Sequence, residues 1–76
     1  MNTRHKEELL LNEDILKGQW KQLTGGIKQQ WGKLTDDALT EIDGNREKMV
    51  GKLQESYGYT REQAERELDA YLERNR

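Results

Sequence analysis

The sequence predicts an all-α fold in which four short helices pack as two hairpins, in an orthogonal or bundle-like arrangement. Apolar residues recur at helical spacing in four segments of the chain. The chain has no proline, so its glycines separate those segments. Strand signals are absent, because no segment alternates apolar and polar residues and the chain has one valine and no phenylalanine.

The first predicted helix begins at Asn12 or Asp14 and ends at Trp31. Six large apolar residues fall on one stripe about 80° wide, which is a strong amphipathic pattern. These residues are Leu16, Trp20, Leu23, Ile27, Trp31 and Leu34. Gly25 and Gly26 weaken the helix, since each costs up to about 1 kcal/mol relative to alanine. The stripe keeps its phase across both glycines, so we expect one helix without a break there.

Two shorter helices follow. Thr35 is a suitable N-cap for the second helix, and Asp43-Gly44 ends it. Asn45 can cap the third helix, which ends at Gly58. The apolar face of the third helix consists of Met49, Val50, Leu53 and Tyr57.

The fourth helix opens with a capping box, Thr60 and Gln63. Its inner face consists of Ala64, Leu68, Tyr71 and Leu72. The joints between the four helices are only a few residues long, which favours hairpins between neighbouring helices.

A chain of 76 residues forms one domain at most. We expect a flexible N-terminal extension over residues 1–12 and a single helical domain over 13–76, with a monomer favoured. The absence of cysteine excludes disulfides, thiolate catalysis and cysteine-based zinc sites. The apolar run Leu9 to Leu11 is too short for a secretory signal, and no run approaches the length of a membrane span, so a cytoplasmic protein is expected.

No constellation of side chains predicts catalysis, a metal or a cofactor, so we expect neither an enzyme nor a small-molecule substrate. His5 is the only histidine and lies in a polar segment without identifiable partners. The carboxylates of the fourth helix lack the Glu-x-x-His elements that a bundle metal site requires. They are interpreted as a solvated face, made of Glu62, Glu65, Glu67 and Asp69.

The charge distribution suggests one candidate surface. Residues 15–34 contain four lysines and no acid, whereas residues 35–76 are net acidic. Lys17, Lys21 and Lys28 lie on one flank of the predicted first helix, beside the tryptophan stripe. Such a flank can contact nucleic-acid phosphates or an anionic membrane. The favoured alternative is that the tryptophans are core anchors with lysines at their edge. The predicted core anchors are Trp20, Leu23, Ile27, Trp31, Leu53, Tyr57 and Leu68.

Two stretches of the chain resemble the CsbD-like family, over roughly residues 13–74. The first half matches at Trp20-Lys21-Gln22, Gly25, Lys28, Gln30-Trp31-Gly32 and Leu34-Thr35-Asp36-Asp37. The second half matches at Gly44, Val50-Gly51-Lys52-Leu53-Gln54-Glu55, Tyr57-Gly58-Tyr59 and Gln63-Ala64-Glu65. Two features depart from the family pattern: residues 1–12 extend beyond the usual start, and Gly26 replaces a polar helix former.

The resemblance implies a small bacterial helical protein of two packed hairpins that is associated with the general stress response. It implies no catalytic activity, cofactor or binding residues. The function expected is therefore non-enzymatic, by contact with an unidentified protein partner or by abundance. The alternative is weak binding of nucleic acid or an anionic membrane surface through the lysine flank.

Overall fold

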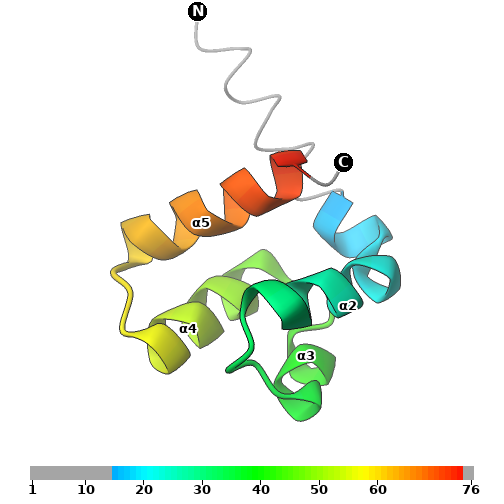
Figure 1. Ribbon diagram of the computed structural model, residues 1–76, viewed down its shortest axis with the longest axis horizontal. Coiled ribbons are helices and arrows are strands. Elements are labelled where there is room, and N and C mark those ends of the chain that lie inside the picture. The colour runs from blue at the N-terminus through cyan, green and yellow to red at the C-terminus, as the bar shows by residue number, and fades with distance from the viewer. Residues whose placement is uncertain (1–14, 75–76) are drawn as a thin grey trace, which may run out of the picture.

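The computed structural model describes residues 15–74, and every element of regular structure in that range is a helix (Figure 1). The prediction of an all-α fold is therefore confirmed. A short helical segment spans residues 15–18. The longer helices are α2 (Trp20–Gln30), α3 (Asp36–Ile42), α4 (Arg46–Tyr57) and α5 (Arg61–Arg74). The proposed extension over residues 1–12 lies outside the described residues.

Side-chain caps begin three of these helices, as the sequence predicts. The Thr35 hydroxyl accepts a hydrogen bond from the Ala38 amide at 3.1 Å, at the start of α3. The side-chain oxygen of Asn45 does the same at the start of α4, and the Thr60 hydroxyl at the start of α5, each at 3.1 Å. Each bond satisfies one of the amides that a helix N-terminus leaves without an intrahelical partner.

The expectation of one helix up to Trp31 is wrong beside Gly18, a third glycine that weakens the predicted helix. The helix runs unbroken through Gly25 and Gly26, but it is interrupted at Gln19, where φ is −117° and ψ is 21°. The segment before the interruption also contacts a turn that is distant in the sequence. A Cβ at Gly44 would lie 3.1 Å from the Leu16 carbonyl oxygen, so the 15–18 segment packs directly on the turn between α3 and α4. The predicted start of this helix, before residue 15, lies outside the described residues.

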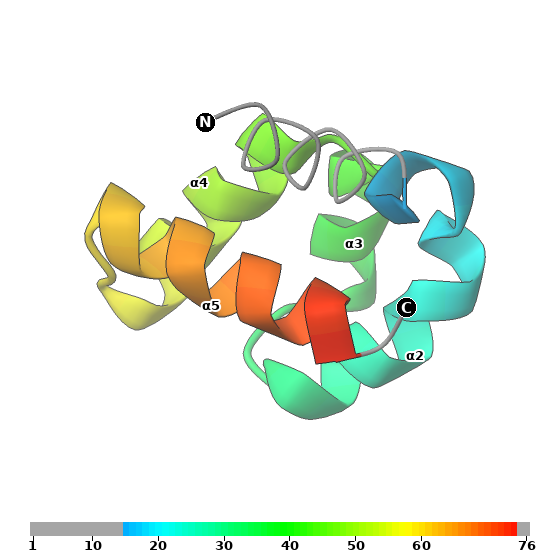
Figure 2. The ribbon, with the colours of Figure 1, turned by 90° about the horizontal axis from the view of Figure 1, so that it is seen from above.

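Helices α4 and α5 pack against each other and run in roughly opposite directions, and α3 packs against α4 (Figures 1 and 2). A bidentate ion pair joins α4 to α5. Arg46 Nη1 and Nη2 lie 2.6 and 3.1 Å from the two carboxylate oxygens of Asp69. The division into two separate hairpins stays a prediction. Two hairpins would pair α2 with α3 and α4 with α5, but α3 packs on α4 as well.

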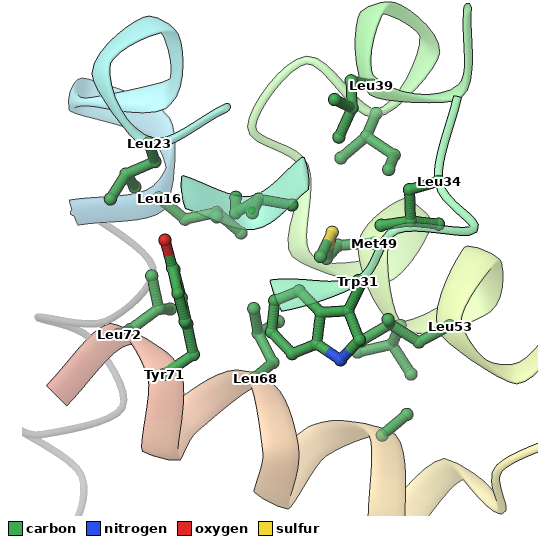
Figure 3. Packing of buried hydrophobic residues seen from close by; sticks show 14 of the residues in the cluster. Leu16, Leu23, Trp31, Leu34, Leu39, Met49, Leu53, Leu68, Tyr71 and Leu72 are labelled. Atoms are coloured by element: carbon green, nitrogen blue, oxygen red, sulfur yellow. The ribbon is translucent and has the colours of Figure 1, made fainter. Parts of the chain in front are cut away.

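One buried cluster holds residues from all four helices, from residues 15–18 and from the α2–α3 loop. Its members are Leu16, Trp20, Leu23, Ile27, Trp31, Leu34, Leu39, Ile42, Met49, Val50, Leu53, Ala64, Leu68, Tyr71 and Leu72. Trp31 lies near the centre, between residues of α4 and α5 (Figure 3). Its ring centroid is 5.2 Å from that of Tyr71, with the planes tilted by 57°. Burial raises the pKa of the Tyr71 hydroxyl, and the nearby Arg74 cation partly offsets this rise.

Two helical glycines have room for a side chain, so replacing either one with alanine should stabilise its helix. A Cβ at Gly25 in α2, or at Gly51 in α4, would have no non-local atom within 4 Å. We expect Gly25→Ala and Gly51→Ala each to stabilise the domain by up to about 1 kcal/mol, because alanine loses less backbone entropy in a helix. Urea unfolding followed by circular dichroism measures the change; a loss of stability in either variant would contradict the open surroundings of that glycine.

Candidate functional site

An open groove of about 560 Å³ lies between α2 and α3. Its lining residues are Trp20, Lys21 and Thr24 from α2 with Asp36, Leu39, Thr40 and Asp43 from α3 and its C-cap. Trp20 and Leu39 form the floor, since only 7% and 4% of their surfaces are exposed. The groove thus combines an apolar base with polar side chains at its rim, which is the usual composition of a binding cleft.

One side of the groove carries exposed lysines. Lys21 lines it, and Lys17 and Lys21 together line an adjoining hollow of about 400 Å³ that also includes Trp20 and Asp43. Neither ammonium group has an ion-pair partner among residues 15–74.

The opposite side of the groove carries carboxylates. Asp36 lies 2.6 Å from the Nζ of Lys28, a contact that joins the start of α3 to the end of α2. Both side chains are at least half exposed, so this ion pair contributes less than about 1 kcal/mol to stability. Asp43 is also exposed, and its φ of 44° is left-handed, a conformation that aspartate tolerates better than most residues.

The predicted lysine surface is therefore one side of a mixed-charge groove. Lys21 lines the groove itself, Lys17 joins it only in the adjoining hollow, and Lys28 is held by Asp36. Sequence reasoning missed the acidic side. The sequence places Asp36 and Asp43 at the two ends of the second predicted helix, and no local pattern indicates that this helix lines the same groove as Lys21.

The predicted core anchors lie in the buried cluster with one exception. The six buried ones are Trp20, Leu23, Ile27, Trp31, Leu53 and Leu68. Tyr57 is half-buried and packs against the cluster, and its ring stacks on that of Tyr59 with centroids 5.4 Å apart. The backbone amide of Lys33 donates a hydrogen bond to the Tyr57 hydroxyl at 3.0 Å, and the Lys33 ammonium lies 5.1 Å from the ring centroid. Tyr57 therefore fastens the α2–α3 loop to the end of α4.

One carboxylate of α5 differs from the predicted solvated face. The Asp69 side chain is only 24% exposed and is bound by Arg46, because it lies on the side of α5 that packs on α4. Glu62 is exposed, Glu65 and Glu67 are half-buried, and Glu65 lies 3.6 Å from Arg61. His5 lies outside the described residues.

No three histidine, cysteine or acidic residues among residues 15–74 are placed to hold a metal ion together. No helix in the same range is both long and apolar enough to cross a membrane.

Comparison with known proteins gives consistent matches. The sequence profile of the CsbD-like family matches residues 14–66. The UPF0337 protein YjbJ of Escherichia coli is 52% identical over 65 residues, which cover 86% of this chain and 94% of that protein. The UPF0337 protein PA4738 of Pseudomonas aeruginosa is 55% identical over 64 residues, covering 84% of this chain and 98% of that protein. The UPF0337 protein pc0632 of Protochlamydia amoebophila is 52% identical over 66 residues, covering 87% and 100%. No solved structure matches the chain.

Proposed function

Because this chain belongs to the CsbD-like family, we propose that it is a non-enzymatic, stress-associated bacterial protein that acts by contact with a protein partner, through the groove between α2 and α3. The observation that carries the proposal is the groove itself, which has a buried tryptophan at its base and exposed charges on both sides. Apolar area at the centre with polar groups at the rim is the arrangement typical of a protein-binding surface.

The surface composition of the described residues supports contact with a protein partner at one place, the groove between α2 and α3. The large apolar side chains of residues 15–74 are buried in one cluster or packed against it, so they leave no broad exposed apolar patch. Arg46 and Arg61 are engaged in ion pairs outside the groove. Lys17 and Lys21 have no such partner among the described residues, and both are therefore available to a partner.

The alternative function, binding of nucleic acid or an anionic membrane through the lysine flank, gains no support. A phosphate chain or an anionic lipid surface approaching Lys21 would also meet Asp36 and Asp43 on the other side of the groove. The two carboxylates would repel the phosphates or the anionic lipids, and this repulsion opposes such binding. The mixed charge favours a partner whose own charges vary along the chain, as those of a protein do.

Photo-crosslinking in stressed cells tests the proposal. A photoreactive amino acid is placed at Thr40, an exposed residue that lines the groove, and at Arg66, an exposed residue of α5 that does not. We expect discrete protein adducts from position 40 and none of the same mass from position 66. Equal adducts from both positions would contradict a defined contact surface. An absence of adducts from position 40 under every stress applied would favour action by abundance alone.

A further inference from the structure

We infer that the partner which binds the groove is a second copy of this chain. Each copy inserts the exposed rim of its α3 into the groove of the other, so that Lys21 of one faces Asp43 of the other. The inference rests on the proposed function and adds the identity of the partner to it. Two features support it: the groove carries one unpaired charge of each sign, and the rest of its lining is uncharged.

One lysine and one aspartate of the groove lack an ion-pair partner. Lys28 and Asp36 lie 2.6 Å apart, and this pair is neutral as a whole. Lys21 and Asp43 remain, and neither forms an ion pair with another of residues 15–74. Both are exposed and both also line the adjoining hollow, where Lys17 joins them. One cation and one carboxylate of the groove are therefore open to groups of another molecule.

A two-fold axis makes this pair of charges self-complementary. In a symmetric dimer, a residue of one copy contacts a second residue of the other copy, and the same contact is repeated in reverse. A rim of α3 that carries Asp43 into the groove of a second copy meets Lys21 there. One lysine and one aspartate per chain thus form two equivalent ion pairs, and a positive group meets a negative group at both places.

The uncharged lining suits residues that lie near such an axis. A charged residue close to the axis would meet the same charge on the other copy and would be repelled. Apart from the charged residues already named, the groove is lined by Trp20, Thr24, Leu39 and Thr40. Thr40 is exposed, whereas Trp20 and Leu39 form the base, so an uncharged rim can cover an apolar floor without burying a charge.

The dimer is expected to be weak and to depend on concentration. Seven residues line the groove, whereas a standard stable interface uses about 20–30 residues on each side. By mass action, the population of such a dimer rises with the amount of the chain. Self-association therefore connects action by contact with action by abundance.

Two charge variants of the full-length chain, studied alone and mixed, test the inference. Lys21→Glu leaves two acids where the wild type has one unpaired charge of each sign, and Asp43→Lys leaves two bases. We expect each variant alone to self-associate at least about tenfold more weakly than the wild type. Mixed together, they place an acid opposite a base at both contacts, so we expect the mixed dimer to form at least as tightly as the wild-type dimer.

Backbone amide shifts of ¹⁵N-labelled protein measure the association. We expect the wild type to show shifts in residues 20–24 and 39–44 when it is diluted from millimolar to micromolar concentration. For the mixed dimer, labelled Lys21→Glu is titrated with unlabelled Asp43→Lys, and the same amides are expected to shift.

Lys48→Glu is the matched control, because it makes the same charge change as Lys21→Glu at an exposed site of α4 outside the groove. We expect it to self-associate within about twofold of the wild type. We also expect it to bind Asp43→Lys more weakly than Lys21→Glu does. Asp43 has a left-handed φ of 44°, so Asp43→Asn, which tolerates this conformation, replaces Asp43→Lys if the latter loses its helical circular dichroism. We expect Asp43→Asn to weaken self-association by about threefold or more.

An absence of concentration-dependent shifts in the wild type would overturn the inference, as would a mixture that binds no more tightly than either variant alone. Equal binding of Lys48→Glu and Lys21→Glu to Asp43→Lys would also overturn it, because attraction would then follow net charge. The proposed function is tested separately by the adducts from position 40. Adducts at twice the mass of the chain support the second copy. Adducts of other masses alone would retain protein contact and remove the second copy, whereas an absence of adducts would remove the function.

Discussion

Trp31→Ala is expected to destabilise the domain by about 3–5 kcal/mol. The Trp31 side chain is only 2% exposed, and truncating a buried tryptophan leaves a large cavity in the core. A domain of this length has roughly 4–11 kcal/mol of stability in total, so the loss is a large part of its margin. Trp31 also lies between α4 and α5 in the core, where it contacts the Tyr71 ring, so its removal weakens several helix contacts together (Figure 3).

Far-UV circular dichroism at increasing urea concentration measures this effect without depending on tryptophan fluorescence. Trp31→Phe is the matched control, because it keeps an aromatic ring beside Tyr71 and removes less volume; we expect it to lose clearly less stability than the alanine variant. A Trp31→Ala protein with the wild-type urea midpoint would show that the indole is not a central part of the core.

Gly26→Ala is expected to destabilise the domain by about 1–3 kcal/mol, although alanine is the better helix former. A Cβ at Gly26 would overlap the hydroxyl oxygen of Tyr71, a core residue that is only 6% exposed, so the Tyr71 ring would have to shift to make room. The neighbouring Gly25→Ala, where space is open, changes stability in the opposite direction. The two adjacent glycines therefore separate helix propensity from packing.

A double-mutant cycle with Tyr71→Phe identifies the cause. Removing the hydroxyl leaves the ring carbon Cζ as the nearest atom, 3.5 Å from the new Cβ, which is an ordinary contact distance. We expect Gly26→Ala to become neutral or stabilising in the Tyr71→Phe background, with a coupling of about 1 kcal/mol or more. The same loss of stability from Gly26→Ala in both backgrounds would show that the hydroxyl is not what excludes the side chain.

The local features of this fold are readable from the sequence because neighbouring residues determine them. Thr35, Asn45 and Thr60 cap their helices through bonds that span three residues, so short-range chemistry suffices. The apolar stripe of the first segment places Trp20 and Trp31 on one face, where the structure buries both. Helical periodicity is the strongest signal that a single sequence carries.

The features that could not be predicted depend on residues distant in the chain. The packing of residues 15–18 on Gly44, just before the interruption at Gln19, joins two places that no local pattern connects. The lack of space for a side chain at Gly26 depends on Tyr71, which lies 45 positions further along the chain. Tertiary contacts of this kind override local propensity.

Only the basic side of the candidate site could be predicted from the sequence. The lysine flank follows from helical spacing, and Lys17 and Lys21 do line one hollow that adjoins the groove. The acidic side requires α3 to return beside α2, and this depends on how the loop after Trp31 turns. The function inferred differs between the two cases. A basic flank alone suggests a phosphate-bearing partner, whereas a groove with both charges suggests a protein partner.

The most direct test of the account is the yield of protein adducts from a photoreactive residue at Thr40, compared in three backgrounds within stressed cells. These backgrounds are the wild type, the double reversal Lys17→Glu with Lys21→Glu, and the control Lys48→Glu, at matched expression levels. The account predicts strong adducts in the wild type and the control and a loss of about tenfold or more in the double reversal. Equal yields in all three backgrounds would contradict it, because contact at the groove would then not depend on Lys17 and Lys21, which have no ion-pair partner among residues 15–74.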